Sequence, residues 1–227
     1  MKKYLVLALV VMLCFTIVGC TGDDLDTPDG LEQESPPGSA SEPTPEPTPE
    51  PPSNDAVPAV ITGKIEMEDG GVIGFELYHD IAPQSVQNFV YLARQGFYDG
   101  LTFHRIADLN AGNYIIQGGC PIGTGTGNPG YSIVGEFDSN GHPNNISHTR
   151  GVLSMARSTD FNSAGSQFFI CVGNPLFLDG NYAGFGMITS GIEVADSMVE
   201  TPDVLPVIRT ISIDGNFAFP EPDKLPR

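Results

Sequence analysis

Apolar and polar residues alternate in the second half of residues 60–67, which predicts a half-buried β-strand. Residues 72–77 are mostly apolar and predict a second strand that returns along the first. The tripeptide Asp-Gly-Gly at residues 69–71 lies between them and is typical of a tight turn. The chain is therefore predicted to begin its folded region, residues 58–216, with a β-hairpin.

Apolar residues recur at helical spacing in two further segments. Pro83 suits the first position of a helix, and Gly96 is predicted to end that helix. A second helix is predicted to begin at residues 190–193, where Ser-Gly-Ile-Glu has the form of a capping box. The apolar faces consist of Val86, Phe89, Val90 and Ala93 in the first helix and of Ile192, Ala195, Met198 and Val199 in the second.

Short apolar stretches separated by glycine fill the region between the two predicted helices. A last strand is predicted over residues 207–213. Glycines are concentrated in residues 96–191, as expected for a β domain that is rich in turns. The pattern indicates a mainly β fold, a closed barrel whose ends are covered by the two helices.

The first twenty residues have the pattern of an export signal. A short basic start precedes residues 5–18, which carry no charge and are too few for a membrane span but typical of a signal peptide. Residues 17–20, Ile-Val-Gly-Cys, resemble the lipobox of bacterial lipoproteins. We therefore expect a lipoprotein signal peptide at residues 1–19 and lipidation of Cys20. The alternative is an ordinary signal peptide with an incidental cysteine.

Residues 20–57 are predicted to be an acidic, proline-rich linker. Acidic side chains are frequent here and basic ones are absent, and residues 42–51 repeat Glu-Pro-Thr-Pro. Such a segment cannot form a core, so we expect an extended spacer of polyproline II character. A ligand for a module that reads polyproline II helices is the alternative. Together with Cys20, this spacer predicts an extracytoplasmic protein that is anchored to the cell membrane.

Charge and cysteine content exclude several classes of protein. The formal net charge of −18 argues against nucleic-acid binding and against electrostatic docking on anionic lipid. Only Cys120 and Cys171 remain for the folded region, and we expect buried thiols rather than a disulfide. The four histidines are dispersed, so no metal site and no cofactor are predicted.

Four stretches combine apolar residues with polar groups that a plain core strand would not contain. Arg105 lies between Phe103 and Ile106, which indicates a hydrogen-bond donor held beside an apolar surface; a buried ion pair is the alternative. The four stretches are residues 103–106 (FHRI), 114–119 (YIIQGG), 151–156 (GVLSMA) and 165–170 (GSQFFI).

In this order, the four stretches resemble those of the cyclophilins, a family of peptidyl-prolyl cis-trans isomerases. The resemblance covers the whole predicted folded region. It implies a closed, antiparallel, eight-stranded β-barrel with two capping α-helices. It also implies an enzyme that rotates Xaa-Pro peptide bonds without a cofactor and without a covalent intermediate.

The resemblance further implies a role for particular residues. Arg105, Gln117 and Phe169 would be catalytic, with the arginine donating to the twisted amide more strongly than to the planar one. The substrate-binding residues would be Tyr114, Ile115, Ala156, Arg157, Gln167, Phe177, Leu178 and Tyr182.

The chain departs from the family pattern at the edge of the implied pocket. Phe177 stands where many eukaryotic members have a tryptophan that contacts cyclosporin, so weak cyclosporin binding is expected. Tyr182 stands where the family has a histidine, and Arg157 replaces a small amide residue. Residues 107–113 form a longer segment than in short members, which predicts a displaced pocket wall.

The expected function is isomerisation of Xaa-Pro segments in exported polypeptides, which would assist their folding at the cell envelope. A proline-peptide-binding chaperone or surface module with little turnover is the alternative, and a purely structural envelope lipoprotein leaves the pocket residues unexplained. We expect a monomer that binds no nucleic acid and contacts the membrane through Cys20. Residues 217–227 are predicted to be a C-terminal tail.

Overall fold

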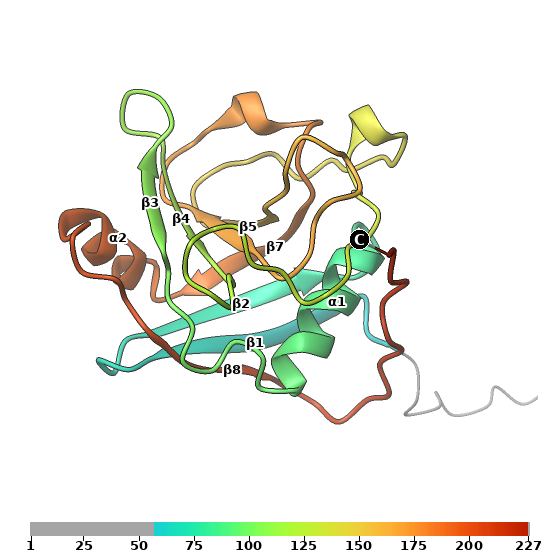
Figure 1. Cartoon of the computed structure of the whole chain (residues 1–227), viewed down its shortest axis with the longest axis horizontal. Coiled ribbons are helices and arrows are strands. Elements are labelled where there is room, and N and C mark those ends of the chain that lie inside the picture. Colours follow the sequence, from blue (N-terminus) through green and yellow to red (C-terminus); the bar gives the residue numbers. More distant parts are fainter. Residues whose placement is uncertain (1–56, 227) are drawn as a thin grey trace, which may run out of the picture. The chain divides into compact units, whose positions relative to one another are not determined.

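The computed structural model describes residues 57–226 of the chain (Figure 1). The predicted signal peptide, Cys20 and the acidic linker as far as residue 56 lie outside the described residues. Within the described part, no helix has the length and apolar character that crossing a membrane would require.

Eight strands, two α-helices and two short 3-10 helices make up the described part. In chain order they are β1 (Val60–Met67), β2 (Val72–Tyr78), α1 (Pro83–Arg94), β3 (Arg105–Asp108), β4 (Tyr114–Gly118), η1 (Asp138–Asn140), β5 (Val152–Met155), β6 (Phe168–Cys171), η2 (Leu176–Leu178), β7 (Gly184–Ser190), α2 (Ile192–Glu200) and β8 (Ile208–Ile213).

All eight strands belong to one antiparallel sheet in the order β3-β4-β6-β5-β7-β2-β1-β8. The sheet curls into a half-barrel (Figure 1). Its two edge strands are joined through the segments that precede them, by a bridge between Thr102 and Val207 and a hydrogen bond from the Phe103 N–H to the Pro206 carbonyl. The mainly β fold with two helices is confirmed, and the predicted closure rests on this short bridge rather than on a ladder between β3 and β8.

The predicted hairpin is formed by β1 and β2. Ile61, Ile65 and Met67 point into the core at alternate positions, as the polar and apolar pattern requires. The Met67 N–H donates to the Gly71 carbonyl and closes the turn, in which Gly70 has a positive φ of 93°. A residue with a side chain is strained in that conformation, which explains the glycine.

Helix α1 begins at Pro83 as predicted and closes the interior of the half-barrel. Its four predicted apolar residues are all buried. The Phe89 ring contacts the rings of Phe75, Phe168 and Phe185 from three different strands. Gly96, at φ 67°, follows the helix as a left-handed terminator.

A distant carboxylate caps the N-terminus of α1. Glu136 is buried and accepts hydrogen bonds from the backbone N–H groups of Gln84 and Ser85 and from the Ser85 hydroxyl, at 2.7–2.8 Å. Its negative charge lies where the helix dipole is positive, which stabilises both. The sequence gives no local sign of this cap, because about fifty residues separate Glu136 from the helix.

The capping box predicted for α2 is wrong. Ser190 is the last residue of β7 and pairs with Gly74, so its backbone belongs to the sheet. Gly191 is the N-cap residue at φ 74°, and no side chain caps this helix. A β-carbon at Gly191 would lie 2.0 Å from the Val72 carbonyl oxygen, so the close approach to β2 requires glycine here.

The predicted C-terminal tail runs along α1 as part of the ordered surface (Figure 1). The Arg94 guanidinium lies 4.6 Å from the centre of the Phe217 ring, and Lys224 lies 4.5 Å from that of Tyr91. Leu225 forms a bridge with Ser132. The described domain therefore continues beyond residue 216.

The sheet has an apolar cluster on each of its faces. The larger cluster fills the half-barrel and includes Ile116, Phe168 and Ile170. The smaller one lies on the opposite face and consists of Ile115, Val152, Phe169, Cys171 and Leu178. Since neighbouring residues of a strand point to opposite faces, β4 and β6 each contribute to both clusters. The smaller cluster forms the floor of the site described next.

Candidate active site

Three predicted catalytic residues lie in one row across three strands. Arg105 of β3 is directly opposite Gln117 of β4, which in turn is opposite Phe169 of β6. Ser154 of β5 continues the row beyond Phe169. Directly opposed residues point to the same face of a sheet, so the ladder itself brings these side chains together.

A relay of side-chain hydrogen bonds fixes the direction of the Arg105 guanidinium. The Arg105 Nη1 donates to Gln117 Oε1 at 3.1 Å, and Gln117 Nε2 donates to Gln167 Oε1 at 2.9 Å. Gln167 Nε2 donates to the carbonyls of Gly125 and Gly127, both at 2.8 Å. Because those carbonyls only accept and a guanidinium only donates, both amides have one permitted orientation.

The glycine-rich loop at residues 123–127 anchors the far end of this relay. The backbone N–H groups of Gly125 and Gly127 donate to Cys120 Sγ at 3.2 and 3.3 Å. Burial alone would raise the pKa of Cys120, but hydrogen bonds from the backbone of this loop outweigh it and lower the pKa. The loop is thus held by a thiol on one side and by Gln167 on the other.

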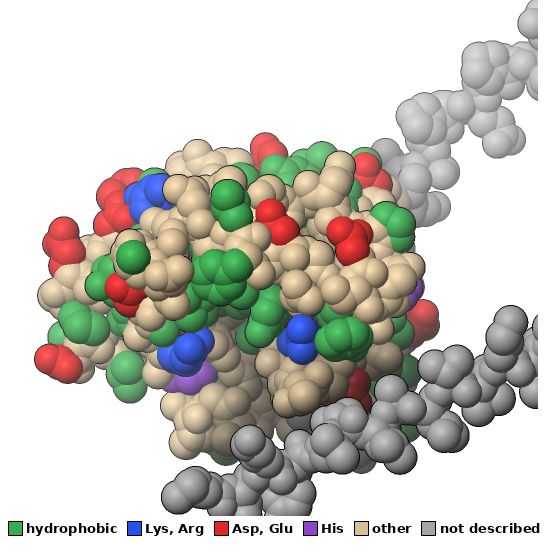
Figure 2. All heavy atoms as spheres, turned by 90° about the horizontal axis from the view of Figure 1, so that it is seen from above, with side chains coloured by type: hydrophobic (Ala, Val, Ile, Leu, Met, Phe, Trp, Pro, Cys, Tyr) green, Lys and Arg blue, Asp and Glu red, His purple; other side chains and the backbone are tan. Residues whose placement is uncertain are grey.

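Arg105 borders a cavity of about 310 Å³ on the outer face of the half-barrel, which we call the apolar cavity because most of its lining residues are apolar. Ile115 and Phe169 form its floor, and Leu178 and Tyr182 close one side. Figure 2 looks onto this side of the molecule, where hydrophobic side chains gather at the centre with Lys or Arg side chains beside them. The lining residues are Arg105, Leu109, Ile115, Gln117, Ala156, Arg157, Phe169, Phe177, Leu178 and Tyr182.

A second cavity of about 300 Å³ adjoins the first, and apart from Ala156 its lining consists of glycines and polar residues, so we call it the polar cavity. Its lining includes the glycine-rich loop, Thr126, Asn128 and Gln167. Gln117, Ala156 and Arg157 line both cavities and so form the ridge between them. An extended peptide with one residue in the apolar cavity would have to cross this ridge to reach the polar one.

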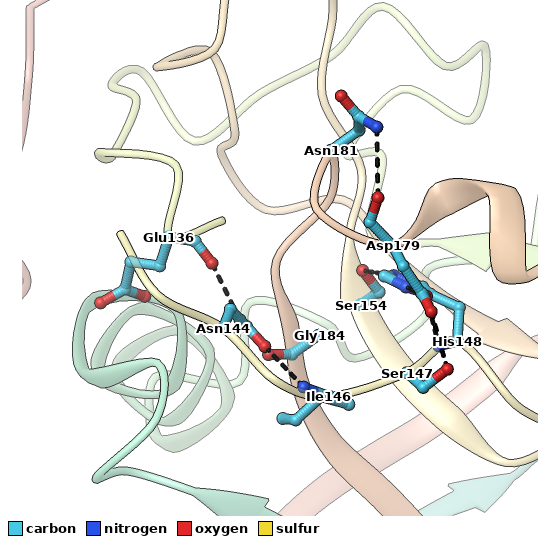
Figure 3. Close-up of polar contacts among 9 residues, drawn as sticks. All are labelled: Glu136, Asn144, Ile146, Ser147, His148, Ser154, Asp179, Asn181 and Gly184. Atoms are coloured by element: carbon cyan, nitrogen blue, oxygen red, sulfur yellow. Dashed lines mark hydrogen bonds and ion pairs between the residues drawn. The ribbon is translucent and has the colours of Figure 1, made fainter. Parts of the chain in front are cut away.

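A polar network of His148, Ser154 and Asp179, drawn in Figure 3, lies next to Phe169 of the cavity floor. The fully buried His148 ring stacks on Phe169 at 6.0 Å between ring centres. His148 Nδ1 lies 2.9 Å from Asp179 Oδ1, and Nε2 lies 2.9 Å from Ser154 Oγ. Beside a carboxylate, Nδ1 carries the proton and donates, so Nε2 accepts from the Ser154 hydroxyl.

The electrostatics of this network keep His148 neutral. Burial lowers its pKa, although the hydrogen bond with Asp179 opposes the shift. Burial would raise the pKa of Asp179, but hydrogen bonds from the His148 backbone, the Ser147 hydroxyl and the His148 ring outweigh it and lower the pKa. A neutral imidazole that donates to an ionised carboxylate is consistent with the lowered pKa of His148 and with the lowered pKa of Asp179. The network joins the segment after η2 to β5, directly beneath Phe169.

Residues 62–214 match the family described as "Cyclophilin type peptidyl-prolyl cis-trans isomerase/CLD". The chain belongs to this family. It is 47% identical over 148 residues to "Peptidyl-prolyl cis-trans isomerase B" of Bacillus subtilis. The matched region covers 65% of this chain and 96% of that protein. It is 43% identical over 145 residues to a peptidyl-prolyl cis-trans isomerase of Helicobacter pylori, covering 63% and 83%.

The fold is similar to solved cyclophilin structures as well. A Cryptosporidium parvum cyclophilin-type isomerase has a TM-score of 0.60 and 30% identity, over 69% of this chain and 99% of that one. A second structure of that protein, in the presence of the dipeptide Ala-Pro, has a TM-score of 0.59 and 31% identity, over 68% and 99%. These relatives identify the chain as a cyclophilin-type peptidyl-prolyl cis-trans isomerase.

In this cyclophilin, the structure brings together ten of the eleven predicted site residues around the two cavities. Tyr114 is the exception. Ile115 and Gln117 face the apolar cavity, so strand alternation turns Tyr114 toward the opposite face of β4. Arg105 is exposed and hydrogen-bonded to an amide, which excludes the alternative of a buried ion pair.

Leu109 lines the apolar cavity and was not predicted as a site residue. The long segment at residues 107–113 extends the β3–β4 hairpin, with Asp108 accepting the N–H groups of Asn110 and Gly112. This turn places Leu109 over the cavity while Arg105 stays opposite Gln117. In place of the predicted displacement of the pocket wall, the segment changes which residue lines the cavity. The signal in the sequence was Leu109, a large apolar residue in a turn of small and polar residues.

Proposed function

We propose that this isomerase rotates Xaa-Pro bonds of exported polypeptides outside the cytoplasm, and that Arg105 stabilises the twisted amide. The observation that carries the proposal is the row of Arg105, Gln117 and Phe169, which sets a fixed donor beside an apolar cavity. A structure of a relative obtained in the presence of Ala-Pro supports a proline-containing ligand.

The chemistry needs positioning and charge rather than bond making. Rotation about a peptide bond crosses a barrier of roughly 18–20 kcal/mol because the planar amide has partial double-bond character. In the twisted state the proline nitrogen regains a lone pair. With the proline ring on Phe169 and Ile115, the Arg105 guanidinium donates to that nitrogen more strongly than in the planar state. The relay through Gln117 and Gln167 holds the guanidinium ready, so little reorganisation is needed during rotation.

The location outside the cytoplasm rests on the first fifty-seven residues. A signal-like segment ends at Cys20, and an acidic, proline-rich segment separates Cys20 from the domain. Acylation of Cys20 would place the isomerase at the membrane surface, where newly exported chains fold.

Exposed Phe177 at the cavity edge, in place of a tryptophan, supports weak binding of cyclosporin.

Exchange spectroscopy on a short Xaa-Pro peptide tests the catalytic role. We expect the full chain to accelerate cis-trans exchange and the Arg105→Ala variant to lose about 100-fold or more of kcat/KM. Arg209→Ala is the matched control, since Arg209 lies on β8 and pairs with Glu66. Saturable peptide binding without accelerated exchange would instead favour the binding-module alternative.

Metabolic labelling tests the anchor. When cells are fed a labelled fatty acid, the full chain that they produce should carry the label, and a Cys20→Ser variant of the chain should not. Equal labelling of the two proteins would contradict lipidation at Cys20, and it would leave the isomerase activity untouched.

A further inference from the structure

The groove formed by the two cavities is positively charged, although acidic side chains outnumber basic ones in the described residues. Arg105 and Arg157 line it, and no described Asp or Glu does. Neither arginine forms an ion pair with a carboxylate of the described residues. A local positive potential at the centre of an acidic protein favours an anionic ligand at this point.

Arg157 is held rigidly on the ridge between the cavities. Its Nε and Nη2 donate to the Asn181 carbonyl at 3.0 and 2.8 Å, and Nη1 donates to the Ser158 carbonyl at 2.9 Å. The guanidinium also lies 4.6 Å from the centre of the Tyr182 ring. Three of its five N–H groups are thus used, and one on each terminal nitrogen remains for a ligand. A fixed guanidinium loses little conformational entropy on binding a carboxylate.

The position of Arg157 relates it to one residue of the substrate. In the proposed function the proline ring occupies the apolar cavity, and a preceding residue reaches the polar cavity. The residue directly before the proline then lies on the ridge, within reach of Arg157, because consecutive residues of an extended chain are only about 3.3 Å apart.

Carboxylates on the neighbouring loops do not neutralise this arginine through an ion pair. Asp108 and Asp160 each accept a backbone N–H group within their own turns. Asp179 accepts the backbone N–H of His148 and lies against its ring. The oxygens of these three carboxylates therefore accept hydrogen bonds from groups other than Arg157.

We infer that this isomerase prefers prolines that are directly preceded by glutamate or aspartate, and that Arg157 is the residue that sets this preference. The inference rests on the proposed function and names its substrate class. Arg105 serves the amide of every Xaa-Pro bond, whereas Arg157 distinguishes among the residues before the proline. An acidic side chain gains a fixed counter-charge there, and a lysine meets repulsion.

The test compares three blocked peptides, Ala-Xaa-Pro-Phe with Xaa as Glu, Gln or Lys, on the full chain at low ionic strength. We expect kcat/KM for the Glu peptide to exceed that for the isosteric Gln peptide about three- to fivefold, with Lys lowest. Arg157→Gln should reduce the Glu-to-Gln ratio to about one, and Arg157→Lys should retain part of it. Arg209→Gln, which removes the same charge at a distant site, should leave the ratio unchanged. In 1 M salt the ratio should approach one, because the Debye length falls to about 3 Å.

The ratio separates recognition from structure. If Arg157 only supported Tyr182, its replacement would slow all three peptides equally and leave the ratio intact, and this would overturn the inference. Equal rates for the three peptides on the unchanged chain would overturn it too, while the isomerase function stood. Failure to accelerate any peptide beyond the Arg105→Ala level would instead refute the proposed catalytic role.

Discussion

Two parts of the apolar cavity differ in how the chain supports them. The wall lies on strands, where ladder pairing sets the position of each side chain. The rim lies on loops and on η2, and one of its side chains, that of Arg157, is held by the distant backbone carbonyl of Asn181. The wall consists of Arg105, Gln117 and the floor residue Phe169, and the rim consists of Leu109, Arg157, Phe177 and Tyr182.

The difference shows which changes each part tolerates. The turn at residues 109–113 lies beyond the paired positions of β3 and β4, so it leaves Arg105 opposite Gln117. The same segment changes the rim, where Leu109 now faces the cavity. The wall can therefore keep its position while the rim varies, which is why the proposed preference for the residue before the proline is assigned to the rim residue Arg157.

The largest expected contrast is between two phenylalanines. Phe169 of the wall is 3% exposed and Phe177 of the rim is 56% exposed. Phe169→Ala should lower the free energy of unfolding by about 3–5 kcal/mol, because it leaves a cavity between Ile115 and His148. Phe177→Ala should change it by less than about 0.5 kcal/mol. Urea unfolding of both variants against the unchanged chain measures the difference, and similar losses would remove the distinction between wall and rim.

The support beneath the wall should respond to pH. Burial keeps the pKa of His148 below its ordinary value of about 6.5, so below that pH the unfolded chain binds a proton that the folded state does not. The free energy of unfolding should therefore fall as the pH drops below about 6.5, and this loss should level off below the folded-state pKa. Asp179, whose pKa is also lowered, adds a loss only in more acidic solution.

A His148→Gln variant isolates this contribution. It keeps His79 and His104, whose pKa values are lowered mainly by burial, so their share of the pH dependence remains. The variant should be less stable than the unchanged chain at pH 7.5 but should lose less stability between pH 7.5 and 5. Parallel curves for the two proteins would show that the floor is not coupled to protonation of His148.

The smallest expected effect concerns the residue that the long hairpin adds to the rim. Leu109→Ala should raise KM for a short Xaa-Pro peptide about threefold with little change in kcat, because part of an apolar contact is lost. Tyr114→Leu should leave KM unchanged, since Tyr114 faces the other side of β4. If Tyr114→Leu raised KM and Leu109→Ala did not, the side chains would line the cavity as the family resemblance implied.

Much of the fold follows from local pattern. The alternation in β1, the turn at Gly70 and the apolar face of α1 are short-range features, and the structure confirms each. The free, buried state of Cys120 and Cys171 is confirmed as well. The capping box failed because pairing with β2 uses the backbone of Ser190, and long-range pairing outweighed a local preference.

The sequence by itself determined the residues of the wall, because β-strand register carries residues that are far apart in the chain to adjacent positions, and four ordered motifs specified that register. Tertiary structure alone decided the rest. Glu136 caps a helix about fifty residues away, and the Asn181 carbonyl holds the Arg157 guanidinium. Each of these contacts joins segments whose approach depends on how the whole sheet curls, and no local pattern encodes that curvature.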